Sequence, residues 1–147
     1  METRLLITHS QEHFLNSCKL AHLGTADRMG MPQVVPVCFI YLSGKVYIAV
    51  DEKPKLSKNL KRIRNIIENP NVTLTADYYD DTDWSKLGWV MIRGHANIIA
   101  GGEEFDMAHR NLRHKYHQLK SMELESLPVI VIQVTNVTSW GNLLQGQ

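Results

Sequence analysis

The sequence predicts a mainly β protein of the α+β class, an antiparallel six-stranded barrel with flanking helices. Short runs rich in β-branched and aromatic residues recur along the chain, and turn residues separate them. Tight turns such as Ser43-Gly44 join neighbouring runs into hairpins, which favour antiparallel pairing. Few segments have helical periodicity, so the chain lacks the crossover helices of a doubly wound parallel sheet.

The first third of the chain contains one short helix and three strands. Ser10 is the expected cap of a helix that runs through Phe14 and Leu15. The three strands are expected at residues 20–26, 33–42 and 45–50. Pro36 lies inside the second of them, where it removes a ladder hydrogen bond. We therefore expect an edge position, a bulge or a place where a ligand meets the backbone.

The rest of the chain adds two helices and three strands. A helix is expected from about Pro54 to the Asn69-Pro70-Asn71 stop, and a second helix over residues 103–122. The remaining strands are expected at residues 72–79, 88–99 and 129–137. The last of them is β-branched on both faces. One face can fill the barrel, and we expect a second copy of the chain to cover the other.

Length and composition indicate one domain and exclude several classes of protein. A chain of 147 residues can bury a core without disulfides or metal. Its net charge of +1 argues against a nucleic-acid binder. Cys18 and Cys38 fit no zinc or redox spacing, and no segment has the length or pattern of a membrane span or a signal peptide. These features predict a cytoplasmic protein with no membrane partner.

Two clusters of polar residues suggest metal ions but lack the required spacing. His109, His114 and His117 are separated by five and three residues, which does not place all three on one helical face. We expect a solvated helix there. The acidic loop of residues 77–84 lacks the glycine and terminal glutamate of a calcium loop, so we expect a solvated turn or a cap.

The segment from Lys53 to Arg64 contains six of the sixteen Lys and Arg residues. On a helix, an apolar face forms from Leu56, Leu60, Ile63 and Ile67, and a basic stripe beside it from Lys55, Lys58 and Arg62. A helix start offers unpaired N–H groups and a positive dipole end, so basic residues there favour an anion site. The alternative is an ordinary solvated helix face.

Several motifs, in this order, resemble the FMN-binding split-barrel superfamily, which includes pyridoxamine 5'-phosphate oxidase. The run LGTADRMGMPQVVPVCF at residues 23–39 is similar to its opening hairpin, with Gly24 where alanine is common and Gln33 where histidine is common. DEKPK at residues 51–55 resembles its cofactor-phosphate turn. YYDDTDWSKL at residues 78–87 and SWG at residues 139–141 resemble the branch of enzymes that use the deazaflavin coenzyme F(420). The resemblance spans about the whole chain.

This resemblance implies a six-stranded split barrel that forms a homodimer, with a flavin or deazaflavin in each groove between the two chains. By position, Lys53 and Lys55 would hold the cofactor phosphate, and Lys58 and Arg62 a longer anionic tail. The ring would lie against the backbone of residues 34–37. The remaining cofactor-binding residues implied are Thr25, Pro36 and Val37 beside the ring, and Trp84 and Trp140 from the other chain.

The implied activity is hydride transfer between the bound cofactor and a small organic substrate. Four basic side chains exceed the needs of one phosphate, which favours coenzyme F(420) over FMN. A flavin carries the hydride itself, so no catalytic side chain is assigned. Two alternatives stay open: an FMN-dependent oxidoreductase of the same fold, or a non-catalytic module that binds a flavin, a deazaflavin or another phosphorylated or tetrapyrrole-like ligand.

Overall fold

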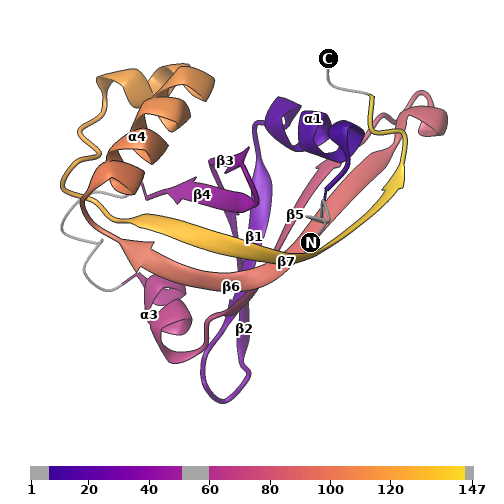
Figure 1. The fold of residues 1–147 in the computed structure, drawn as a ribbon. Coiled ribbons are helices and arrows are strands. Elements are labelled where there is room, and N and C mark those ends of the chain that lie inside the picture. The colour runs from indigo at the N-terminus through magenta and orange to yellow at the C-terminus, as the bar shows by residue number, and fades with distance from the viewer. Residues whose placement is uncertain (1–6, 51–59, 145–147) are drawn as a thin grey trace, which may run out of the picture.

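The computed structural model describes residues 7–50 and 60–144 (Figure 1). Its helices are α1 (His9–Ser17), α3 (Lys61–Glu68) and α4 (Glu103–Lys115), with the short 3-10 helices η1 (Trp84–Lys86) and η2 (His117–Ser121). Its strands are β1 (Ala21–Ala26), β2 (Pro32–Val37), β3 (Phe39–Leu42), β4 (Lys45–Ala49), β5 (Asn71–Tyr78), β6 (Gly88–Ile99) and β7 (Val129–Gly141). No helix in these two ranges combines the length and the hydropathy needed to cross a membrane.

The strands form one antiparallel sheet in the order β2-β1-β5-β6-β7-β4-β3. β2 and β3 occupy the two ends of the sheet, yet only Cys38 separates them in the chain, so the sheet must curl. The predicted mainly β barrel class is confirmed, with seven strands in the described residues because the run at 33–42 divides at Cys38. The first half of this run, β2, pairs with β1, and the second half, β3, pairs with β4. Pro36 lies on an end strand, one of the three positions expected for it.

Residues at the C-terminal end of α4 bind the backbone where β2 ends and β3 begins. The Tyr116 hydroxyl accepts a hydrogen bond from the Phe39 amide at 3.0 Å and donates one to the Phe39 carbonyl at 3.1 Å. Lys115 Nζ donates to the same carbonyl at 2.9 Å and lies 3.9 Å from the centroid of the Phe39 ring. These contacts satisfy the backbone groups at the point where the strand changes partners.

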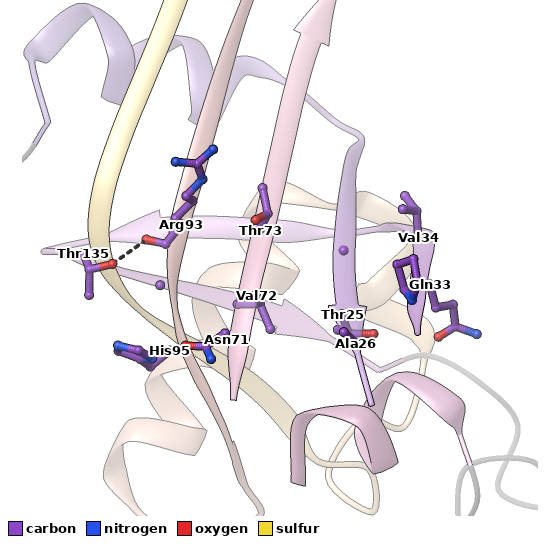
Figure 2. A pocket seen from close by; sticks show the side chains of 13 residues that line it. Thr25, Ala26, Gln33, Val34, Asn71, Val72, Thr73, Arg93, His95 and Thr135 are labelled. Atoms are coloured by element: carbon purple, nitrogen blue, oxygen red, sulfur yellow. Dashed lines mark hydrogen bonds between the residues drawn. The ribbon is translucent and has the colours of Figure 1, made fainter. Parts of the chain in front are cut away.

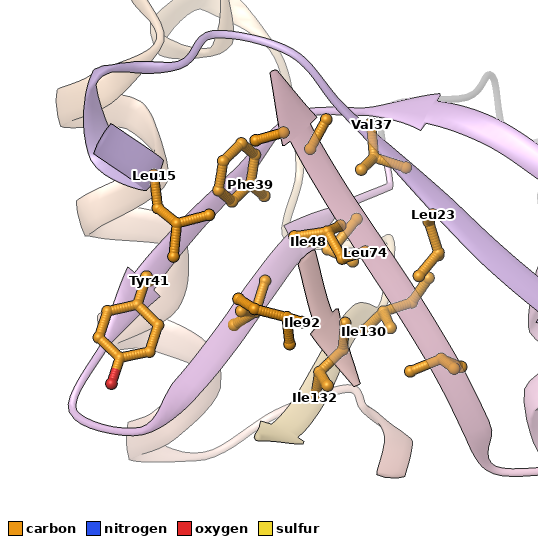
Figure 3. Close-up of a cluster of buried hydrophobic side chains, with 14 of the residues drawn as sticks. Leu15, Leu23, Val37, Phe39, Tyr41, Ile48, Leu74, Ile92, Ile130 and Ile132 are labelled. Carbon is orange, nitrogen blue, oxygen red and sulfur yellow. The ribbon is translucent and has the colours of Figure 1, made fainter. Parts of the chain in front are cut away.

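The main hydrophobic core fills the concave side of the curled sheet (Figure 3). α1 closes one end of this core with Phe14 and Leu15, which are fully buried. Thr8, not the expected Ser10, caps α1, because the Thr8 hydroxyl accepts the Gln11 amide while the Gln11 side chain accepts the Thr8 amide.

A second core lies between α4 and the sheet, and it corrects one expectation about the last strand. Ile130 and Ile132 of β7 enter the main core, whereas Val129 and Val131 enter the second core against Phe105 and other residues of α4. The expectation that a second copy covers this other face is wrong, because α4 of the same chain covers it.

The basic helix differs from its predicted form. Leu60 has a ψ of 128°, outside the helical range, so α3 begins at Lys61 and the helix expected from about Pro54 does not continue through Leu60. Ile67, expected on the buried face, is 73% exposed, while Asn65 and Ile66 are buried. The helix predicted over residues 103–122 also ends earlier, since α4 stops at Lys115 and η2 follows.

β6 and β7 pair over their whole lengths except at one bulge. The register shifts between Arg93 and Gly94, so Thr135 of β7 has no opposite residue. Thr135 Oγ1 instead donates to the Arg93 carbonyl at 3.2 Å. A Cβ atom at Gly94 would lie 2.7 Å from Ile132 Cγ2 and closer still to a backbone oxygen of β7. Glycine is therefore required at the bulge.

Candidate functional site

A groove of about 410 Å³ crosses the outer face of the sheet over β2, β1, β5, β6 and β7 (Figure 2). Alternation along the strands separates the side chains that point into it from those that point into the core. Leu23, Leu74 and Ile92 point into the main core, so the residues that follow or precede them point outward. The groove is lined by Gly24, Thr25, Ala26, Pro32, Gln33, Val34, Asn71, Val72, Thr73, Arg93, Gly94, His95 and Thr135.

The middle of the groove has a floor of small residues. Gly24 lies opposite Val34 on one side and Thr73 on the other, and Thr73 lies opposite Arg93. This register makes one row across four strands, from an apolar residue on β2 to a cationic residue on β6. A Cβ at Gly24 would meet only the Thr73 carbonyl, at an ordinary 3.6 Å, so glycine there leaves open space rather than relieving a clash.

The β6 side of the groove carries two nitrogen-bearing side chains, Arg93 and His95. They are two residues apart on one strand, so both face outward, and His95 lies opposite Asn71. In the described ranges no carboxylate lies within 4.0 Å of either side chain. Figure 2 shows both on the opposite side of the groove from Gln33 and Val34. This wall favours a ligand with negative charge.

A buried hydrogen bond connects the groove to α3. Asn65 is fully buried, and its Nδ2 donates to Thr25 Oγ1 at 3.0 Å. No donor among the described residues reaches Asn65 Oδ1 or Gln33 Oε1, although both oxygens are buried. Gln33 lies opposite Thr25 and lines the groove, whereas Asn65 does not line it. The unsatisfied Gln33 acceptor matches an N–H donor of a ligand.

Two ion pairs also fasten α3 to the turn between β1 and β2. Lys61 Nζ lies 3.9 Å from Asp27 Oδ2, and Arg28 Nε lies 3.6 Å from Glu68 Oε1. Asp27 itself organises this turn by accepting the amides of Met29 and Met31. Both ends of α3 are thus held beside the groove, and α3 contains the last three basic residues of the segment from Lys53 to Arg64.

The structure places some of the predicted site residues at the groove and others away from it. Thr25 lines the groove, although its hydroxyl is engaged by Asn65. Pro36 is exposed on β2, while the Val37 side chain is in the core, so only its backbone faces a ligand. Arg62 is half-buried in the first turn of α3. Three predicted residues lie outside the described ranges: Lys53, Lys55 and Lys58.

The two tryptophans predicted to act from the other chain are exposed, Trp84 by 68% and Trp140 by 56%. Trp140, near the end of β7, lies opposite Trp89 near the start of β6, on the outer face. Neither Trp84 nor Trp140 lines the groove of its own chain. Large apolar side chains with this exposure are candidates for contact with another molecule.

Sequence reasoning missed Asn65 and the pair Arg93 and His95. A helical asparagine gives no local sign that it is buried, and the groove wall comes from the pairing of β6 with β5. The one available signal was alternation within residues 88–99, which already places Arg93 and His95 on the same face.

Neither polar cluster considered as a metal site brings three possible ligands together in the part of the chain that the structure describes. The expectation of a solvated helix is wrong at His109, which is only 3% exposed and packs edge-on against the Phe105 ring at 4.3 Å. Burial lowers the pKa of His109, and the nearby Arg113 charge lowers it further. In the acidic loop, Asp83 caps η1, one of the two roles expected there.

The curled sheet with its split edge defines a split-barrel protein. Residues 7–141 match the sequence model of the family described as Pyridoxamine 5'-phosphate oxidase, and the chain belongs to this family. No curated protein is similar enough in sequence to match it.

Solved structures share the fold at low sequence identity. Rv2991, a conserved hypothetical protein from Mycobacterium tuberculosis, gives a TM-score of 0.74 at 16% identity, covering 96% of this chain and 90% of that one. A heme binding protein from Mycobacterium smegmatis gives 0.71 at 19% identity, covering 95% of this chain and 56% of that one. HutZ, the heme storage protein from Vibrio cholerae, gives 0.66 at 15% identity, covering 87% and 89%.

Proposed function

We propose that this protein is an oxidoreductase that binds the deazaflavin coenzyme F(420) and transfers a hydride between it and a small organic substrate. The observation that supports this most is the groove on the outer face, fastened to α3 by the Thr25–Asn65 bond. Membership in the pyridoxamine 5'-phosphate oxidase family supports a flavin-type cofactor. FMN is the alternative cofactor for the same groove.

The residues present fit such a cofactor. Gln33 Oε1, in the groove lining, is a buried acceptor without a donor in the described ranges, and the pyrimidine edge of a flavin or deazaflavin carries an N–H donor. The backbone of β2 from Val34 to Val37 would support the ring beside Thr25 and Pro36. When bound, the cofactor itself accepts or donates the hydride. The chain's own residues bind it, orient it and exclude water.

The anionic end of the cofactor is assigned to the basic segment. Lys53 and Lys55 would hold the phosphate, with Lys58 and Arg62 on the longer tail. Charge-assisted hydrogen bonds contribute roughly 1.5–3 kcal/mol each, so Lys55→Ala should weaken binding by about ten- to a hundredfold. Unchanged affinity with a lower melting temperature would instead make Lys55 a structural residue of its segment.

Fluorescence titrations of FMN and of coenzyme F(420) at two salt concentrations test the choice of cofactor. We expect the deazaflavin to bind at least as tightly as FMN, and more tightly as its glutamate tail lengthens. Arg62→Gln should weaken the long-tailed form most, whereas Arg64→Gln, an exposed arginine of the same helix, is the matched control. Tight FMN binding without deazaflavin binding would promote the FMN enzyme, and binding of neither would remove the flavin function.

We further propose that the protein works as a homodimer. Val34 is 66% exposed and Trp140 is 56% exposed on the outer face, and small-molecule sites favour interfaces. Light scattering at micromolar concentration should show a dimer, and Trp140→Ala should reduce cofactor affinity more than dimerisation. A monomer that binds cofactor at full strength would contradict both the interface site and the role of Trp140.

A non-catalytic binding module is the second candidate function. Two structural relatives, from Mycobacterium smegmatis and Vibrio cholerae, are named for heme binding and heme storage. His95 faces the groove and offers an imidazole to a flat ligand of that kind. Turnover of reduced cofactor with candidate acceptors separates the two functions, since a binding module would hold its ligand without consuming an acceptor.

A further inference from the structure

We propose that Arg93 and His95 form an anion-recognising wall of the groove, and that the groove accepts a small organic anion with a flat apolar body. Under the proposed function the cofactor ring lies on the β2 side of this groove and the molecule held from the β6 side is the substrate, so its identity as substrate rests on that proposal. The recognition itself needs only the residues of the groove.

The charge distribution across the groove determines the orientation of this molecule. Val34 and Pro32 on β2 supply an apolar side, and Arg93 and His95 on β6 supply the opposite, polar side. In the chain without cofactor, a molecule that spans the groove therefore meets apolar contacts at one end and N–H donors at the other. A carboxylate or phosphate group on the β6 side would receive charge-assisted hydrogen bonds from the Arg93 guanidinium.

The floor between the two sides suits a flat body. Gly24, Ala26 and Thr73 are small, and a Cβ at Gly24 would make only an ordinary contact with the Thr73 carbonyl. A planar ring can approach this floor closely and bury the apolar area of the face that meets it once the anion is held. The groove volume of about 410 Å³ is in the range of small-molecule sites.

The bulge between β6 and β7 is an independent observation that supports a built site. It lies between Arg93 and Gly94, and Thr135 Oγ1 binds the Arg93 carbonyl there. Gly94 separates the two residues of the wall and is required by the close approach of β7. Bulges redirect side chains and are frequent beside functional sites. In this chain the extra residue of the bulge, Thr135, is on β7, and β6 continues to pair with β5 without interruption, so Arg93 and His95 stay on the same face.

A matched pair of fluorescent probes tests the inference on the purified chain. 1-Anilinonaphthalene-8-sulfonate carries a flat apolar body and an anion, and N-phenyl-1-naphthylamine has the same body without the charge. We expect Arg93→Gln to weaken the sulfonate about tenfold or more and to leave the neutral amine unchanged. His95→Gln should weaken the sulfonate in the same selective way. Arg110→Gln, an exposed arginine on α4 outside the groove, should change neither probe.

A second variant locates both probes in the groove. Gly24→Val places a side chain on the floor without a clash at its Cβ, so it should exclude both probes while the protein remains folded. Sulfonate binding that is unchanged in Arg93→Gln, or equal loss of both probes in that variant, would overturn the inference. Binding of both probes at full strength in Gly24→Val would also overturn it, because the probes would then lie elsewhere.

The cofactor titrations remain a separate measurement. If the chain binds neither FMN nor the deazaflavin, the proposed oxidoreductase fails while the probe pair still decides whether Arg93 and His95 recognise an anion. If the cofactor binds and the probe result is negative, only the anionic substrate class is lost.

Discussion

Replacing Thr25 with valine tests how α3 is held beside the groove. The substitution keeps the shape of the side chain and removes the hydroxyl that accepts the hydrogen bond from Asn65 Nδ2 at 3.0 Å. Thr25 is 4% exposed and Asn65 is fully buried, so water cannot replace the lost partner. Asn65 Oδ1 already has no donor in the described ranges, and the variant would leave both ends of this amide unsatisfied.

The expected cost follows from this burial. A neutral hydrogen bond contributes about 0.5–1.5 kcal/mol net, but a buried donor left without a partner costs about 1–3 kcal/mol. We expect Thr25→Val to lower the free energy of unfolding by about 1–3 kcal/mol, measured by urea denaturation. Thr73→Val, on the neighbouring strand, is the control and should change it by less than about 0.5 kcal/mol.

A double-mutant cycle identifies the cause. Thr25→Val combined with Asn65→Leu removes both partners, so the double variant should lose less stability than the sum of the two single variants. The same loss of attachment should weaken cofactor binding, because α3 carries Arg62. Additive single effects, or a Thr25→Val cost no larger than that of Thr73→Val, would refute the view that this bond holds α3.

Three further predictions concern other parts of the fold. Gly94→Ala should lower the free energy of unfolding by roughly 1–3 kcal/mol in urea, because its Cβ would collide with β7, whereas Gly101→Ala, with open space around its Cβ, should be nearly neutral. Burial lowers the pKa of His109 below 6.5, so the stability it contributes is present above pH 6.5 and lost as pH falls. Melting temperatures from about pH 7.5 to about pH 5 should fall less steeply in His109→Gln. Tyr116→Phe should lower the melting temperature by leaving the Phe39 amide unsatisfied; an unchanged value would show that this contact does not hold the strand break.

Local patterning in the sequence determined most of the elements. The Ser43-Gly44 turn and the alternation of residues 88–99 predict a hairpin and a strand that the structure contains. These features depend on neighbours in the chain, because turn conformation and side-chain direction are set within a few residues. The family resemblance rests on the same local motifs, and the match over residues 7–141 confirms the family. The coenzyme F(420) branch and the residues from Lys53 to Lys58 stay predictions.

Tertiary structure alone decided where a strand changes its pairing partner and what covers each face of the sheet. Nothing local shows that the run at residues 33–42 leaves β1 for β4 at Cys38, or that α4 covers Val129 and Val131. The groove joins Gly24 to Arg93 through the register of β1, β5 and β6, and Asn65 is buried only because α3 packs on Thr25. Each of these contacts links residues far apart in the sequence, and its energy depends on the packing of both partners, which no local pattern encodes.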